Sequence, residues 1–197
     1  MPLFGDMHSF AIALELIDQP ENVTVAQGNE GSYGELMLMF DHRIITQHNS
    51  INSTNYIQCP LLPIIKWFIT TGWNYTNSEE YPIAVDAINL SAAKVWSQIS
   101  LTDEIEDDVI DTWWENHCLQ AAGEQVLPAV FFIGKTDQVE ISCIKPIVAT
   151  TLVPGQEFAI TLSNLITWFI SQPKIRQQIW YSGLLHSAWE TESLLLP

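Results

Sequence analysis

The hydrophobic period of this chain changes twice along its 197 residues. Apolar residues alternate with a period of two over residues 10–17 and 35–40, which predicts strands because successive side chains of a strand point to opposite faces. Residues 18–34 between them hold proline, glycines and polar residues and are expected to form a loop. Residues 41–43 are expected to turn the second strand into a hairpin with residues 44–48.

Three consecutive helices are predicted for the middle of the chain, where the period becomes helical. The first is expected over residues 64–75, and Pro60 and Pro63 suit its entry because a missing N–H costs little in a first turn. The second is expected over residues 83–100. The third runs from about Asp103 to Leu119, and its acidic start is favoured by the positive end of the helix dipole. Its inner stripe is expected to consist of Ile105, Val109, Ile110, Trp113 and His117.

The period returns to two in the second half of the chain. Strands are predicted over residues 129–133 and 139–144, joined by a tight turn at residues 134–137. The remaining predicted elements are a strand over 147–152, a short apolar segment over 158–160, and helices over 162–171 and 174–190. With no internal repeat and no linker, this order predicts one α+β domain over residues 1–197, with mostly antiparallel strands packed against about five helices.

The charge of the chain limits its partners. The sequence has 23 acidic and 7 basic residues, so its net charge is −16. Such a charge repels nucleic-acid phosphates and anionic membrane surfaces, which leaves a cationic protein surface or a metal ion as the natural complement. No apolar run is long enough to span a membrane, and the start lacks the basic residues of a signal peptide. With three widely spaced cysteines expected to be buried thiols, we predict a cytoplasmic protein.

No catalytic or metal-binding motif is present in the sequence. A zinc helix needs two histidines one turn apart, and the five histidines are isolated from one another. Cys118 follows His117 directly, but adjacent residues on a helix point in different directions. We therefore expect a non-enzymatic protein without metal or cofactor. The alternative from the enzyme class is a hydrolase that uses His117 or His186 with a nearby carboxylate.

The densest charge lies at residues 103–111, where six carboxylates occur in nine residues. One interpretation is a solvated helix N-terminus, where the dipole favours carboxylates. The other is a face that docks on a basic surface, because no basic residue occurs between Lys94 and Lys135. Trp114 lies one residue off the inner stripe and could serve as an apolar anchor. The predicted partner-binding residues are Asp103, Glu104, Glu106, Asp107, Asp108, Asp111 and Trp114.

The order of several motifs resembles a known family. A strand ending in IIT at residues 44–46 is followed by CPLLPIIKW at 59–67 and by GW at 72–73. The segment W-x-x-H-x-L-x-A-A-G follows at 114–123, with Pro128 before the next strand. Over about residues 35–190 this resembles the domain that precedes the metallopeptidase unit in some bacterial ImmA/IrrE-type proteins. The chain departs from that pattern in lacking the HExxH unit and in having Ala129 where an acidic residue is expected.

The resemblance implies a prokaryotic recognition or regulatory module from a stress-response, mobile-element or phage-defence locus, without protease activity. The leading hypothesis is therefore an accessory subunit that binds a basic protein surface. A second hypothesis is that the acidic surface imitates nucleic acid and occupies a DNA- or RNA-binding protein. That hypothesis predicts carboxylates spaced along a surface, instead of gathered at one helix end.

Overall fold

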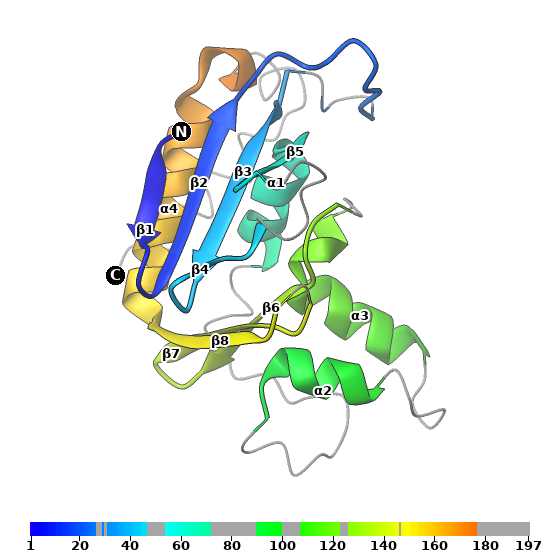
Figure 1. Ribbon diagram of the computed structural model, residues 1–197, viewed down its shortest axis with the longest axis vertical. Coiled ribbons are helices and arrows are strands. Elements are labelled where there is room, and N and C mark those ends of the chain that lie inside the picture. Colours follow the sequence, from blue (N-terminus) through cyan, green and yellow to red (C-terminus); the bar gives the residue numbers. More distant parts are fainter. Residues whose placement is uncertain are drawn as a thin grey trace.

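The computed structural model describes residues 1–26, 29, 31–46, 54–71, 90–99, 107–122, 126–145 and 147–176. These residues form two antiparallel sheets with helices packed against them (Figure 1), which confirms the α+β fold predicted from the sequence. The elements in chain order are β1 (Leu3–Asp6), β2 (Phe10–Leu16), β3 (Tyr33–Phe40), β4 (Arg43–Ile44), β5 (Ile57–Pro60), α1 (Leu62–Thr71), α2 (Ala92–Ile99), α3 (Asp107–His117), the 3-10 helix η3 (Leu119–Ala122), β6 (Val130–Lys135), β7 (Gln138–Cys143), β8 (Ala149–Pro154) and α4 (Gly155–Ser171).

Sheet A contains β1 to β5 in the order β1-β2-β3-β4, with β5 also paired to β3. The alternating apolar residues of β2 and β3 meet as cross-strand pairs that are at most 1% exposed. These pairs are Phe10–Phe40, Ile12–Leu38 and Leu14–Leu36. They belong to the main core together with apolar residues of α1 and α4. The predicted period of two therefore marks the face of sheet A that packs against these helices.

The turn between β3 and β4 lies where it was predicted. Asp41 and His42 have φ values of 52° and 58°. A two-residue hairpin turn of type I′ requires positive φ at both central positions, and its twist matches that of the flanking strands. The turn carries the chain into β4, while residues 47 and 48 of the predicted strand lie outside the described residues.

Sheet B has the order β6-β7-β8 and is covered on both faces. On one face Val130, Phe132 and Ile141 join the main core. On the other face Phe131 and Ile133 join a second cluster with residues of α2 and α3. Figure 1 shows α2 and α3 at the lower right, away from sheet A.

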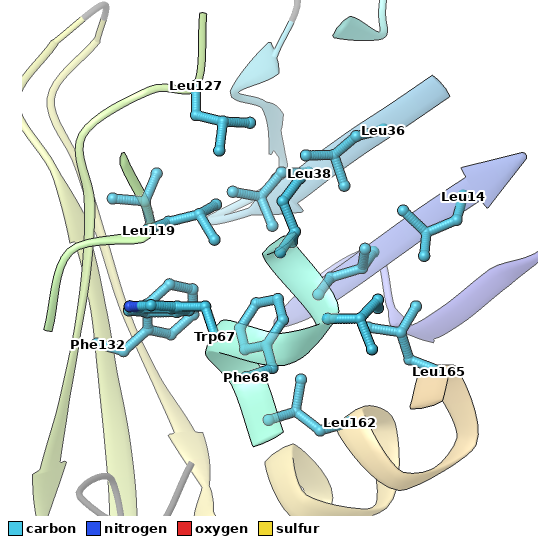
Figure 2. Packing of buried hydrophobic residues seen from close by; sticks show 14 of the residues in the cluster. Leu14, Leu36, Leu38, Trp67, Phe68, Leu119, Leu127, Phe132, Leu162 and Leu165 are labelled. Carbon is cyan, nitrogen blue, oxygen red and sulfur yellow. The ribbon is translucent and has the colours of Figure 1, made fainter. Parts of the chain in front are cut away.

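Phe132 connects sheet B to the rest of the main core. Its ring centroid lies 5.8 Å from that of Phe68 in an edge-to-face arrangement, 5.8 Å from Trp67 and 6.0 Å from Phe10. Figure 2 shows Trp67 and Phe68 between Phe132 on one side and the leucines of β2, β3 and α4 on the other. Aromatic pairs at these separations add about 0.5–1.5 kcal/mol each to the gain from burial. This cluster therefore fixes how the two sheets sit around α1.

Two local predictions are wrong, and one strand was not predicted. Residues 57–60 form β5, whose Pro60 pairs with Tyr33, so only Pro63 lies in the first turn of α1. Strand β1 was not predicted, because its four residues show no alternation. Helix α4 begins at Gly155, directly after β8, and includes the segment at 158–160 that was expected to precede it. In the last case a Pro-Gly pair, typical of a turn, instead ends a strand and begins a helix.

The second and third predicted helices are present as α2 and α3, and their predicted starts at residues 83–89 and 103–106 lie outside the described residues. The same holds for the last predicted helix beyond residue 176. Across the described ranges, no helix has both the length and the apolar character of a membrane span.

Candidate docking face on helix α3

Helix α3 has one buried and one exposed face. Trp113 is 5% exposed and His117 is fully buried, whereas Asp108, Asp111 and Glu115 are exposed. The predicted inner stripe is thus confirmed for Trp113 and His117. It is wrong for Val109, which is 47% exposed. Among the described residues, the ring and hydrogen-bond contacts found between α3 and β6 are made by Trp113 and His117, one and two turns beyond Val109.

The buried face of α3 packs in an aromatic cluster. The Trp113 ring stacks on Trp96 of α2 at 5.9 Å and on Phe131 of β6 at 5.7 Å. Trp114, the predicted anchor, is half-buried, and its ring centroid lies 6.3 Å from that of Trp96. The indole Nε1 of Trp67 donates a hydrogen bond of 2.8 Å to the carbonyl of Glu115, which ties α3 to α1. These contacts hold α3 in one orientation.

His117 and Cys118 are both enclosed. The Nδ1–H of His117 donates to the carbonyl of Phe132 at 3.0 Å, since a carbonyl only accepts. Burial raises the pKa of the Cys118 thiol to about 12. Reactive cysteines are instead partly exposed and have lowered pKa values. His117 is therefore a packed, hydrogen-bonded histidine, as predicted. Cys59, Cys118 and Cys143 are all buried cysteines that form no disulfide, also as predicted.

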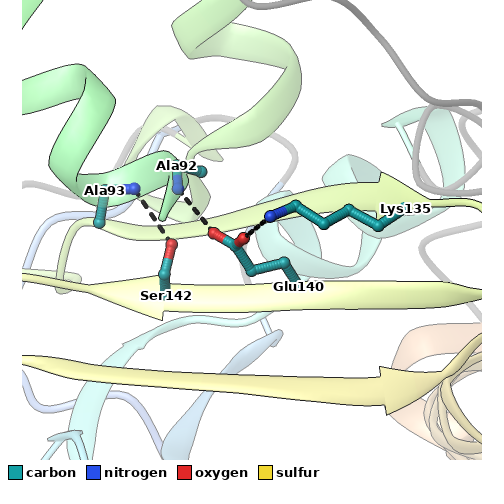
Figure 3. A network of polar contacts seen from close by, with 5 residues as sticks. All are labelled: Ala92, Ala93, Lys135, Glu140 and Ser142. Carbon is teal, nitrogen blue, oxygen red and sulfur yellow. Dashed lines mark hydrogen bonds and ion pairs between the residues drawn. The ribbon is translucent and has the colours of Figure 1, made fainter. Parts of the chain in front are cut away.

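Helix α2 is fixed to sheet B by a polar network that the sequence did not predict. The Glu140 side chain, from β7, is 3% exposed, and its Oε1 accepts a hydrogen bond of 2.6 Å from the N–H of Ala92. Its Oε2 forms an ion pair with Nζ of Lys135. Oγ of Ser142 accepts from the N–H of Ala93 at 3.1 Å (Figure 3). Two side chains of β7 thus satisfy the first two N–H groups of α2, which have no partner within the helix.

The acidic side chains on the exposed face of α3 form no ion pair among the described residues. No ion pair found there involves Asp108, Asp111 or Glu115. Asp107 begins α3, and Asp103, Glu104 and Glu106 lie outside the described residues. Within the described ranges, no three His, Cys, Asp or Glu side chains are grouped to hold a metal ion. Of the predicted docking residues, Asp108 and Asp111 are thus exposed and Trp114 is half-buried, and Glu115, which was not predicted, adds a further exposed carboxylate to this face.

Two histidines that are far apart in sequence are neighbours in space. His8 and His42 lie on adjacent turns at one end of sheet A, with their Nδ1 atoms 3.1 Å apart. These histidines are isolated along the sequence, 34 positions apart, and meet only in the folded chain. The pairing of β2 with β3 brings them together, and no local sequence pattern signals it.

No protein-family model, curated protein or solved structure matches this chain. The resemblance to the domain before the metallopeptidase unit therefore stays a prediction.

Proposed function

We propose that this protein is a non-enzymatic module that binds a basic surface of another protein through the exposed face of α3. The observation that carries the proposal is the division of this helix into two faces. Trp113 and His117 anchor it in the protein, while Asp108, Asp111 and Glu115 stay exposed and form no ion pair among the described residues. A partner with lysines and arginines would supply that counter-charge.

The rigidity of the face favours recognition. Helix α3 stacks on α2 through Trp96, and α2 is held on sheet B by Glu140. Little conformational freedom is then lost on binding, which reduces the entropic cost of association. Exposed charges mainly raise the association rate and the selectivity, so most of the affinity must come from buried apolar contacts. The half-buried ring of Trp114 is the aromatic group of α3 placed to make one.

The sequence resemblance supports a more specific context for this binding. We place the protein as a cytoplasmic accessory subunit in a prokaryotic stress-response, phage-defence or mobile-element system, beside a separately encoded effector.

The test compares two double variants with the same change in net charge. One carries Asp108→Lys and Asp111→Lys on α3, and the control carries Glu21→Lys and Asp137→Lys, which are exposed elsewhere. Co-purification from the native host at low salt should be lost for the α3 variant and retained for the control. Retention by both, or equal loss from both, would contradict a docking role for this face.

A second candidate function is imitation of nucleic acid, and one observation favours it. Asp108, Asp111 and Glu115 lie along α3 over about 10 Å, given a rise of 1.5 Å per residue, instead of only at its first turn. If the acidic face occupies a nucleic-acid site, DNA or RNA should compete with this protein for the purified partner. If the partner binds this protein and nucleic acid at the same time, imitation of nucleic acid is eliminated and docking on a basic surface remains.

A further inference from the structure

The histidine pair at the end of sheet A has the geometry of a chelating site. His8 belongs to the connection between β1 and β2, and His42 to the turn between β3 and β4. Because Phe10 pairs with Phe40, these two connections are adjacent. Both imidazoles are exposed, with ring centroids 5.1 Å apart and planes inclined by 56°.

The first of the two connections is held by hydrogen bonds. The N–H of His8 donates to Oδ1 of Asp6 at 2.9 Å. Oγ of Ser9 donates to Oε1 of Glu157 in α4 at 2.6 Å. These bonds tie the connection both to itself and to the start of α4.

The second connection is held by its turn geometry and by sheet B. Asp41 and His42 both have positive φ, which defines the turn. Arg43 donates from a guanidinium nitrogen to the carbonyl of Val148 at 2.9 Å, just before β8. With both backbones fixed, the imidazoles meet without the loss of much chain entropy.

We propose that His8 and His42 bind a divalent transition-metal ion, such as Cu²⁺ or Zn²⁺, through their two Nδ1 atoms. With metal–nitrogen bonds of about 2.0–2.1 Å, nitrogens 3.1 Å apart subtend about 100° at the metal, an angle that fits neighbouring ligands in four- to six-coordinate sites. Imidazole suits Cu, Zn and Ni, and Cu²⁺ binds most strongly among the divalent ions of the first row. The net charge of −16 also attracts cations.

The hydrogen bond between the two Nδ1 atoms can be replaced by two metal–nitrogen bonds without loss of a proton from either ring. Without metal, a hydrogen bond between the Nδ1 atoms needs a proton on one of them. On binding, that ring takes its other neutral tautomer, with the proton on Nε2, so both Nδ1 lone pairs face the ion. No third His, Cys, Asp or Glu completes the group within the described residues, so water or a donor from a partner takes the other positions. The site would thus be labile and open to a further ligand.

The test is a Cu²⁺ titration of the untagged full chain by calorimetry, with pulsed EPR to count the coordinated imidazoles. The variants are His8→Gln and His42→Gln, and the controls are His48→Gln and His186→Gln, two other histidines of the sequence. Loss of a group that only supports a metal ligand lowers metal affinity about 10–100-fold, and loss of the ligand itself should cost at least as much. We therefore expect the Cu²⁺ affinity of His8→Gln and of His42→Gln to fall about tenfold or more.

Pulsed EPR should count two imidazoles on Cu²⁺ in the native chain and fewer in His8→Gln and His42→Gln. The controls should match the native chain in both measurements. Binding that is absent, that survives in either variant, or that falls equally in a control would overturn the proposal. Because both histidines are exposed, thermal unfolding should show that the variants remain folded.

Discussion

Replacing Glu140 by alanine should loosen α2 from sheet B. The carboxylate is buried, and it accepts the N–H of Ala92 while it pairs with Lys135. Alanine removes both interactions and leaves the Ala92 N–H without its acceptor in a buried site. Glutamine keeps an acceptor of similar shape but removes the charge.

The magnitude follows from these contacts. Loss of one partner of a buried ion pair costs about 3–5 kcal/mol when the other charge stays buried. The Lys135 side chain is 38% exposed and can turn to water, so the cost should lie at the low end. The lost charge-assisted hydrogen bond contributes about 1.5–3 kcal/mol of this. We expect Glu140→Ala to lower the free energy of unfolding by about 3 kcal/mol, and Glu140→Gln by about 1–2 kcal/mol, since only charge is lost.

Urea unfolding followed by tryptophan fluorescence measures this change, because Trp96 and Trp113 lie in the cluster that α2 forms with α3. For a chain of this size, 3 kcal/mol corresponds to a fall in Tm of about 6–12 °C. Glu21→Gln is the control, since Glu21 is exposed and its loss should change stability by less than about 0.5 kcal/mol. A Glu140→Ala loss that matches this control would refute the reasoning.

Three further predictions test the core. Gly34→Ala should lower the free energy of unfolding by about 1–3 kcal/mol or more. The added Cβ would lie 2.3 Å from the Glu15 carbonyl oxygen and 2.5 Å from Leu61 Cδ1. If urea unfolding shows no loss of stability, the strands can shift to make room and this prediction is wrong. Trp113→Ala should cost about 3–5 kcal/mol by the same assay, whereas Val109→Ala, at an exposed position four residues earlier, should stay within about 0.5 kcal/mol. Equal effects of these two changes would contradict the orientation of α3. Burial raises the pKa of Cys118 from 9.0 to about 12, so this thiol should resist a disulfide reagent at pH 8 until urea is added. Its contribution to stability is full below pH 9 and is lost as the pH rises toward 12, by up to about 1.4 kcal/mol per unit. Cys118→Ala should reduce that dependence and leave the part due to Cys143, whose pKa burial raises to about 11.

Much of the acidic face could be predicted from the sequence. A run of carboxylates before Trp113 predicts a helix with its charge at the N-terminal end, and helical spacing separates the buried Trp113 from the exposed Asp111. The exposure of Val109 could not be predicted in this way. Helical spacing gives the direction of a side chain relative to its own helix, but only the packed structure shows which part of the helix contacts the neighbouring sheet.

The sequence by itself determined the α+β class, the strands of the two central pairs β2–β3 and β6–β7, the buried thiols and the burial of His117. The thiols follow from the number and spacing of the cysteines, and the others from a period of two or of 3.6 set by apolar residues that must leave water. Only the tertiary structure decided the rest. Strand β5 exists because β3 offers it a partner, Glu140 is buried because α2 covers it, and His8 meets His42 because β2 pairs with β3. Such contacts join residues distant in sequence, and no local pattern encodes the geometry that brings them together.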